Sequence, residues 1–176
     1  MRKDEPMTDL YIVRHGIAVE PGTPGIADDE RPLTAKGEKR MRQIARGLRK
    51  LELKLDRIVT SPLPRAHTTA EIIAEVLHIK DRLEISNVLQ AGSSAATIHR
   101  WLRERLEERL MVVGHNPTLS DLVSLLVLGS MQPQICDLKK GGVASLSRTV
   151  PAKDLYDLNW LATPRFFRAL AGDEGE

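Results

Sequence analysis

Short apolar runs alternate with longer segments of helical periodicity along this chain, and this alternation constrains the fold more than any other feature. Three runs have the composition of buried strands: Leu10–Val13, Arg57–Thr60 and Leu110–Val113. Two later runs, at 143–146 and 156–160, alternate more strongly between apolar and polar residues. Strands separated by helices need crossover connections, which make the strands parallel. We therefore expect an α/β fold, a three-layer α/β/α sandwich with a mostly parallel central sheet.

Four segments between these runs place their apolar residues on one helical face. These residues are Met41, Ile44, Ala45, Leu48 and Leu51 in the first segment, Ala66, Ala70, Ile73 and Leu77 in the second, Ile98, Leu102 and Leu106 in the third, and Leu119, Leu122, Val123 and Leu126 in the fourth. Thr34 is the expected N-cap of the first helix, and Pro62 and Pro64 suit the start of the second. The segment from Lys36 to Lys54 contains eight Lys or Arg residues and two Glu residues. Their separation from the apolar face favours a solvated surface, with a docking surface for an acidic partner as the alternative.

Length and composition limit the class of protein. The 176 residues suit one domain over 1–176, with a core from about residue 8 to 164 and frayed termini, including the tail after Leu170. A net charge of +2, with only 2 Trp, 2 Tyr and 2 Phe, does not favour a nucleic-acid partner. A single cysteine, Cys136, favours a reducing compartment. The charged start is no signal peptide, and no run approaches the roughly 20 apolar residues of a membrane span. We expect a cytoplasmic protein without nucleic-acid or membrane partners.

Polar residues directly follow three of the expected strands. Arg14-His15-Gly16 follows the first, Ser61-Pro62-Leu-Pro-Arg65 the second, and Gly114-His115-Asn116-Pro117 the third. Ligands of open α/β sheets bind beyond the carboxyl ends of the strands. Two arginines and two histidines therefore meet at one edge with no carboxylate at these three ends, which predicts an anionic ligand. Arginine forks match phosphate oxygens, and helix N-termini near Pro62 and Asn116 add N–H donors.

Each of these residues also has a purely structural interpretation. His15 can bond a neighbouring carbonyl, Gly16 and Gly114 can be turn glycines with positive φ, and Arg65 can be a surface residue. A cation in a first helical turn opposes the helix dipole, however, unless an anion lies nearby. The other histidines, which fall in expected helices, suit surface or boundary roles: His67, His78 and His99.

Other kinds of site are not supported. The sequence has no phosphate-binding G-x-x-x-x-G-K-[ST] loop, no G-x-G-x-x-G after the first strand and no G-x-S-x-G elbow. It has no H-E-x-x-H and no cysteine pair for zinc. Asp28, Asp29 and Glu30 are consecutive, so their side chains diverge. Cys136 has no histidine at a recognisable spacing. We therefore expect neither a metal nor a cofactor.

Together these motifs resemble the histidine phosphatase superfamily, whose fold is phosphoglycerate mutase-like. The matching residues are Arg14-His15-Gly16, Leu33-Thr34-x-x-Gly37, Ser61-Pro-x-x-Arg65-Ala66-x-x-Thr69-Ala70 and Gly114-His115. Three further segments are similar to the SixA-type phosphohistidine phosphatases: Arg31-Pro-Leu-Thr34, Gly142-Val-Ala-Ser145, and Asn159-Trp160 followed by Pro164. The resemblance covers the chain from about Leu10 to Pro164.

The resemblance implies a metal-independent hydrolase that removes phosphate through a phosphohistidine intermediate. His15 would be the nucleophile, and Arg14, Arg65 and His115 would be catalytic and substrate-binding residues around the phosphate oxygens. The implied substrate is a phosphohistidine-bearing protein, for example a phosphotransfer domain, which would place the enzyme in protein dephosphorylation and signal transduction.

One departure concerns the proton donor to the leaving group. Many relatives place a glutamate where this chain has Val88, while Glu84 lies four residues earlier and Asp28 or Asp29 would have to reach in from a loop. Without an acid we expect weak activity on alkyl phosphate esters, whose leaving oxygen needs a proton. We also expect an open, shallow pocket that admits a protein side chain. The alternatives are a phosphatase acting on a small-molecule monoester, or a catalytically inert module that binds phosphate or phosphohistidine.

Overall fold

A six-stranded mixed sheet organises the computed structural model, which describes residues 8–148 and 154–172. Its strands, in the order β3-β2-β4-β1-β5-β6, are β3 (Leu83–Ile85), β2 (Arg57–Thr60), β4 (Arg109–Gly114), β1 (Asp9–Arg14), β5 (Val143–Ser147) and β6 (Asp157–Ala162). The first four strands are mutually parallel, β5 is antiparallel to its neighbour β1, and β6 is antiparallel to β5. The five expected apolar runs all form strands, and β3 is an addition. The three β3 residues are too few to show a periodicity.

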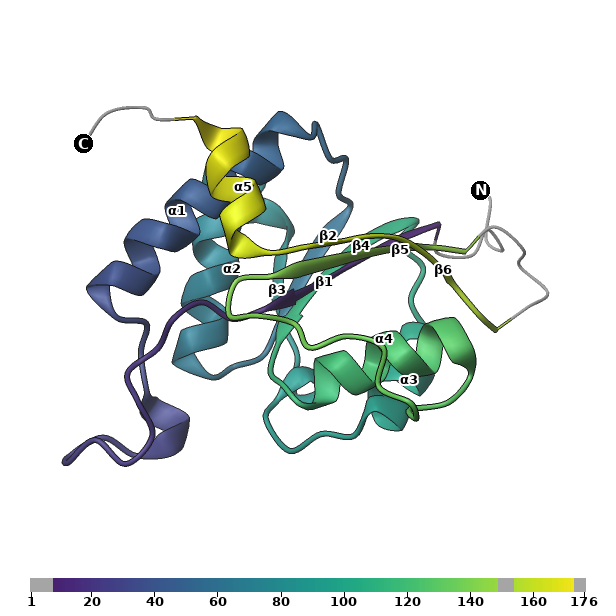
Figure 1. The fold of residues 1–176 in the computed structure, drawn as a ribbon, viewed down its shortest axis with the longest axis horizontal. Helices are drawn as coiled ribbons and strands as arrows, with labels where there is room; N and C mark the ends of the chain where they lie inside the picture. The colour runs from purple at the N-terminus through teal and green to yellow at the C-terminus, as the bar shows by residue number, and fades with distance from the viewer. Residues whose placement is uncertain (1–7, 149–153, 173–176) are drawn as a thin grey trace.

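Helices cover both faces of this sheet (Figure 1), as the three-layer prediction requires. On one face lie α1 (Ala35–Lys50), α2 (Pro64–Val76) and α5 (Pro164–Ala171), and on the other lie α3 (Ala95–Leu102) and α4 (Thr118–Leu128). Each layer encloses its own core. Met41, Ile44 and Phe167 belong to the first core, and Leu102 and Leu122 to the second. In the described part of the chain, no helix is both long and apolar enough to cross a membrane.

Most helix predictions are confirmed. The side chain of Thr34 caps α1 by accepting a hydrogen bond of 2.9 Å from the Gly37 N–H. The third helix, however, ends before Leu106, which is 79% exposed. His78 lies beyond the end of α2 with φ of 59°, so its placement within a helix is wrong.

The predicted end of the core at about residue 164 is too early. Helix α5 begins at Pro164, packs against α1 and buries Phe167 completely. Ala171, in the predicted frayed tail, is only 5% exposed. The apolar residues of this short helix span too few turns to show a helical periodicity in the sequence. The other predicted frayed residues, 1–7 and 173–176, lie outside the described part of the chain.

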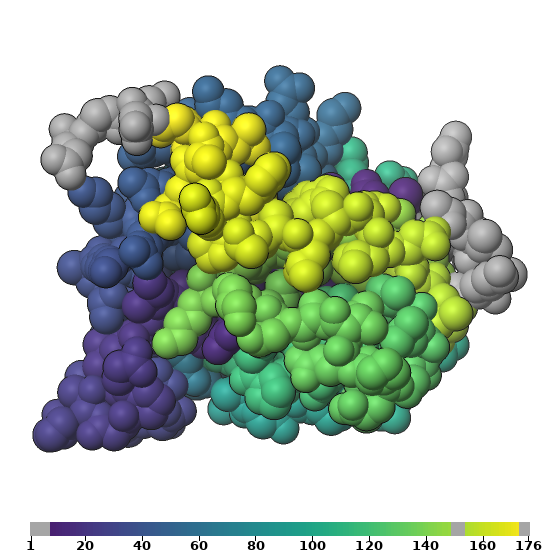
Figure 2. Space-filling model, viewed as in Figure 1, coloured from purple at the N-terminus to yellow at the C-terminus, as the bar shows by residue number. Residues whose placement is uncertain are grey.

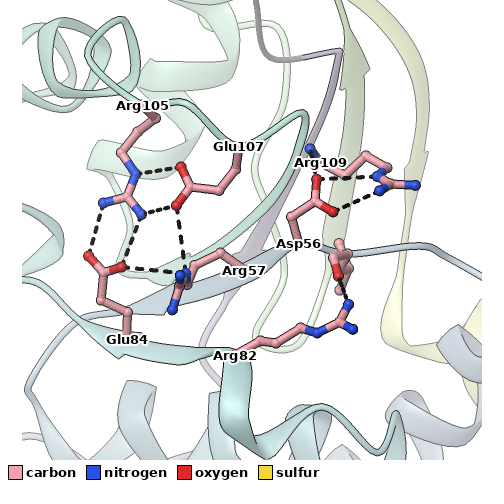
Figure 3. A network of polar contacts seen from close by, with 8 residues as sticks. Asp56, Arg57, Arg82, Glu84, Arg105, Glu107 and Arg109 are labelled. Carbon is pink, nitrogen blue, oxygen red and sulfur yellow. Dashed lines mark hydrogen bonds and ion pairs between the residues drawn. The ribbon is translucent and has the colours of Figure 1, made fainter. Parts of the chain in front are cut away.

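Ion pairs join the amino ends of the strands (Figure 3). The guanidinium of Arg105 contacts the carboxylates of Glu84 and Glu107, and Arg57 lies between the same two carboxylates at 3.7 and 3.6 Å. Beside them, Arg109 pairs with Asp56 at 2.7 Å. This network is distant from the loops that follow the carboxyl ends of β1, β2 and β4, where the polar motifs lie.

Candidate active site

The loops after β1, β2 and β4 form one cleft of about 360 Å³ at the carboxyl edge of the sheet. Its lining residues are Arg14, His15, Glu20, Pro21, Asp28, Arg31, Arg65, Ala91, His115, Asn116 and Lys140. The structure therefore brings together the four predicted site residues, Arg14, His15, Arg65 and His115. The parallel register explains this convergence, because Arg14 pairs with Gly114 and Thr60 with Val113. The segments that follow β1, β2 and β4 must then start side by side.

His15 is held in one tautomer. Its Nδ1 lies 2.7 Å from the carbonyl oxygen of Gly16, which can only accept, so Nδ1 carries the proton and donates it. The lone pair is therefore on Nε2. The residue is only 7% exposed. Burial, together with the charges of Arg65 and Arg14, lowers the pKa of His15 to about 4, so the ring is neutral at pH 7. A neutral imidazole with a free Nε2 is a nucleophile.

His115 is oriented by Ser61. The Ser61 hydroxyl lies 2.8 Å from His115 Nε2 and also accepts from the Leu63 N–H. A hydroxyl has one hydrogen to donate and two lone pairs, so this contact is compatible with the imidazole proton on either Nδ1 or Nε2. That Nδ1 is buried and has no hydrogen-bond partner among the described residues. Burial and the neighbouring His15 lower the pKa of His115 to about 3. The two imidazole ring centres are 5.2 Å apart, so His115 lies beside His15 in the cleft.

The two arginines are fixed by backbone carbonyls. Arg65 is 3% exposed and donates from Nη1 to the carbonyl of Asp28 at 2.8 Å, while Arg14 donates from Nη1 to the carbonyl of Leu138 at 2.7 Å. The Nε atoms of both arginines are buried without a partner in the described part of the chain. Burial lowers the pKa of both guanidinium groups, and both remain charged. Charged donors with unused hydrogens suit an oxyanion such as a phosphoryl group.

Close packing, rather than a positive φ, accounts for the two glycines of the site. Neither Gly16 nor Gly114 has a φ in the left-handed region, so the turn-glycine interpretation is wrong. A Cβ on Gly16 would lie 2.6 Å from Cγ of Met41, inside α1. The Gly16 N–H donates to the Thr69 hydroxyl, which in turn donates to the Arg65 carbonyl. This chain links the loop of His15 to the first turns of α2.

Of the three candidate proton donors, Asp28 lines the cleft. Its carboxylate pairs with Arg31 at 2.8 Å and lies 3.7 Å from Arg65 Nη2. The hydrogen bond from Arg31 holds the pKa of Asp28 below its usual range, so this carboxyl is ionised. Glu84 is engaged by Arg105 and Arg57 in the network of Figure 3. Neither Asp29 nor Val88 lines the cleft, and Val88 packs against the core under α3 and α4.

Sequence reasoning did not place Glu20, Arg31, Asn116 and Lys140 in the cleft. Lys140 and Glu20 form an ion pair of 3.5 Å across its mouth. Arg31 belongs to the motif Arg31-Pro-Leu-Thr34, and Asn116 directly follows His115. Their position in or next to a recognised motif was the signal that could have identified them. The histidines outside the motifs, His67, His78 and His99, do not line the cleft, nor does Cys136, whose thiol has a pKa raised by burial.

Comparison with known proteins decides the family. The family model "Histidine phosphatase superfamily (branch 1)" matches residues 10–110. An uncharacterized protein of Picosynechococcus is 36% identical over 142 residues, which cover 78% of this chain and 84% of the relative. This chain belongs to the histidine phosphatase superfamily. Its predicted phosphoglycerate mutase-like fold is thereby confirmed.

Within this superfamily the chain is similar to SixA proteins. Phosphohistidine phosphatase SixA of Escherichia coli is 25% identical over 158 residues, which cover 88% of this chain and 93% of SixA. A solved structure of the protein histidine phosphatase SixA complexed with tungstate has a TM-score of 0.74 at 24% identity, covering 89% of this chain and 97% of that one. The alpha-ribazole phosphatase of Shigella flexneri has a TM-score of 0.66 at 16% identity, covering 89% and 96%. The SixA-type resemblance is confirmed, and these relatives support a phosphatase.

Proposed function

We propose that this phosphatase hydrolyses phosphohistidine on a partner protein through a covalent phosphohistidine intermediate on His15. The observation that carries the proposal is the hydrogen bond from His15 Nδ1 to the Gly16 carbonyl. It leaves Nε2 unprotonated and directs the lone pair away from the backbone, in a cleft where Arg14 and Arg65 have unused donors. These are the requirements of nucleophilic attack on a phosphoryl group.

The reaction proceeds in two displacements. In the first, His15 Nε2 forms a bond to phosphorus, the N–P bond of the substrate breaks, and the leaving imidazole nitrogen takes a proton from water. In the second, water attacks the phosphorus of phosphorylated His15, the new N–P bond breaks, and inorganic phosphate leaves. Imidazole suits both steps because it is a good nucleophile and a good leaving group near neutral pH.

Arg14, Arg65 and His115 stabilise the charge on the transferring group in this proposal. Donors held in place before the reaction cost no reorganisation when charge develops on the phosphoryl oxygens. The side chains of Arg14, Arg65 and His115 line the cleft, where they would donate to the oxygens of a bound phosphoryl group. The guanidinium groups take the electrostatic role that a metal ion has in other phosphoryl-transfer enzymes, so we propose that the reaction is independent of metal.

The state of the carboxylates supports phosphohistidine as the substrate. Asp28 is ionised and bonded to Arg31, and Glu84 is bonded to arginines outside the cleft, so neither is placed to deliver a proton. An alkyl ester leaves through a basic oxygen that needs such a proton. The leaving nitrogen of phosphohistidine can instead be protonated from solvent. Similarity to the phosphohistidine phosphatase SixA supports the same substrate. With this substrate we propose a role in signal transduction in the cytoplasm.

A small-molecule phosphatase is the second candidate, and Asp28 is the observation that favours it. This carboxylate lies 3.7 Å from Arg65 Nη2 and is exposed to solvent. A substrate phosphate that displaced it from Arg65 would leave it beside the leaving group, where it could act as an acid. The structural likeness to an alpha-ribazole phosphatase is compatible with this reaction. A third candidate, an inert phosphohistidine-binding module, predicts binding without turnover.

A comparison of rates distinguishes the three candidates. We would measure kcat/KM for a phosphohistidine-bearing phosphotransfer domain, for aryl phosphates and for alkyl phosphates at one pH. The proposal expects turnover of the phosphoprotein and of aryl esters with acidic phenols, and very slow turnover of alkyl esters. Fast hydrolysis of one metabolite ester, with slow phosphoprotein turnover, favours the second candidate. Binding of the phosphoprotein without release of phosphate favours the third.

A further inference from the structure

The proposed reaction does not use Lys140, although this lysine lines the cleft together with His15. The Lys140 ammonium lies 3.5 Å from the carboxylate of Glu20, which is beyond the usual length of a hydrogen bond. The neighbouring Lys139, by contrast, donates to the carboxylate of Asp137 at 2.7 Å. Glu20 is also 74% exposed, so water solvates much of its charge. Lys140 is therefore held only weakly by its carboxylate and can exchange it for another anion.

The backbone holds Lys140 beside the nucleophile. The N–H of Gly141 donates to the carbonyl oxygens of both Arg14 and His15, each at 3.0 Å. Gly141 has a φ of 82°, and a Cβ at this position would lie 2.9 Å from Cδ1 of Ile44 in α1, so the turn after Lys140 requires glycine. In Figure 2 the segment before β5, in light green, lies against the dark purple segment that follows β1. The place of Lys140 is thus fixed relative to His15.

The charge of Lys140 acts on the imidazole ring of His15. Together with burial and the charges of Arg65 and Arg14, it lowers the pKa of His15. The Lys140 side chain is 36% exposed, so most of it lies against the protein at the mouth of the cleft. A cation that disfavours a positive charge on the ring favours a negative group bound to the same ring. Lys140 is therefore suited to a phosphoryl group on or next to His15.

We propose that Lys140 is a further substrate-binding residue, which leaves Glu20 and binds an oxygen of the phosphoryl group at His15. This inference rests on the proposed function, because it requires a phosphoryl group in the cleft. Such a group carries up to about two negative charges at pH 7, whereas the Glu20 carboxylate carries one. The flexible four-carbon stem of a lysine allows its ammonium to turn from one acceptor to the other. Glu20 is then a competitor that weakens the binding of anions to the free enzyme.

Opposite effects of the two members of this ion pair test the proposal. Inorganic phosphate is titrated into the full chain at pH 7 and fixed ionic strength, and NMR signals of backbone amides report its Kd. Lys140→Met should weaken phosphate binding by about 10-fold, the scale of one lost hydrogen bond from a charged donor. Glu20→Gln should strengthen it by about 2- to 5-fold, the scale of the exposed ion pair that phosphate otherwise has to break. Glu20→Gln should bring no gain when Lys140 is also replaced by Met.

The ion pair of Lys80 and Glu75 provides matched controls. Its distance of 3.6 Å is close to that of Lys140 and Glu20, and neither residue lines the cleft. Lys80→Met and Glu75→Gln make the same changes in net charge as the two test variants. Each should change the Kd of phosphate by no more than about 2-fold, because salt screens exposed charges that are distant from the site.

Three results would overturn the proposal. Weakening of phosphate binding by both Lys140→Met and Glu20→Gln would make the ion pair a structural link between two loops. A gain from Glu20→Gln that persists in the double variant would be a general effect of charge, and an unchanged Kd in Lys140→Met would leave the lysine without a role. Phosphate binding needs no turnover, so the expected shifts in Kd without hydrolysis of a phosphoprotein would contradict the proposed function alone.

Discussion

At the amino ends of β2 and β4, arginines pair with carboxylates in one network, whereas at the carboxyl ends of β1, β2 and β4 the two arginines Arg14 and Arg65 of the cleft are held by backbone carbonyls. Arg105, Arg57 and Arg109 contact the carboxylates of Glu84, Glu107 and Asp56 (Figure 3). In the cleft, Arg14 and Arg65 donate to backbone carbonyl oxygens, and the carboxylates of Asp137 and Asp28 lie farther away, at 4.0 and 3.7 Å. The first arrangement stabilises the sheet, and the second leaves two guanidinium groups at the cleft for an anionic ligand.

The largest expected effect follows from removing the nucleophile. His15→Ala should abolish turnover without unfolding the protein, because a residue at a strand end contributes more to chemistry than to core packing. Phosphate release measures the first outcome and circular dichroism the second. In the parent protein, brief incubation with substrate followed by mass spectrometry that avoids acid should find phosphate on His15. Phosphate trapped on another residue would contradict the assignment of the nucleophile.

Arginines at the two ends of the strands should respond differently to substitution. Arg65→Ala should lower kcat by about 100-fold or more, the scale of losing one transition-state donor. Arg65→Lys should restore little of it, since an ammonium group cannot reproduce a bidentate fork.

Arg105→Ala is the matched control from the amino ends. It should leave kcat unchanged and lower the free energy of unfolding by about 1–3 kcal/mol, because Glu84 and Glu107 lose hydrogen bonds from a charged donor. Urea unfolding and steady-state rates separate the two effects. Full activity of Arg65→Lys, or a large loss of kcat in Arg105→Ala, would remove the distinction between the two ends.

A smaller effect concerns Asp28, the carboxylate of the cleft that lies beside Arg65. If Asp28 holds Arg65 and does not donate a proton, rates on phosphate esters should depend steeply on the pKa of the leaving group. Asp28→Asn should then keep the same slope and change kcat/KM by only about a few-fold. The measurement is kcat/KM for a series of aryl and alkyl phosphates at one pH. A flat dependence in the parent that becomes steep in Asp28→Asn would make Asp28 the general acid and favour the small-molecule phosphatase.

The sequence was sufficient to predict three of the four parallel strands and four residues of the cleft, because short apolar runs predict the strands and the residues directly after these runs lie at the cleft. Arg14, His15, Arg65 and His115 converge for a simple reason: their strands are parallel neighbours. The elements that were missed are short. The edge strand β3 and helix α5 form through contacts with residues distant in sequence, as Phe167 does under α1. Hydrogen-bond geometry, such as the Nδ1 contact that fixes the tautomer of His15, depends on loop conformation and has no sequence signature.

The two ends should also lose stability in different pH ranges. The folded-state pKa values of His15 and His115, about 4 and about 3, lie below the ordinary value of 6.5, so both rings are neutral in the native protein. The contribution of these neutral rings to the free energy of unfolding is fully present above pH 6.5. It is lost as the pH falls below 6.5, because the histidines of the unfolded chain take up protons first. For each ring, the free energy of unfolding falls by up to about 1.4 kcal/mol per pH unit, or roughly 2 kcal/mol between pH 6.5 and pH 5. At the amino ends, Arg109 and Arg105 hold the pKa values of Asp56 and Glu107 below their ordinary 3.8 and 4.5, so those contributions are lost at lower pH.

Urea unfolding of the parent and of a His15→Asn, His115→Asn variant at pH 7, 6 and 5 separates the two ranges. The variant should lose less stability than the parent over this interval, and equal losses would contradict the burial of neutral imidazoles in the cleft.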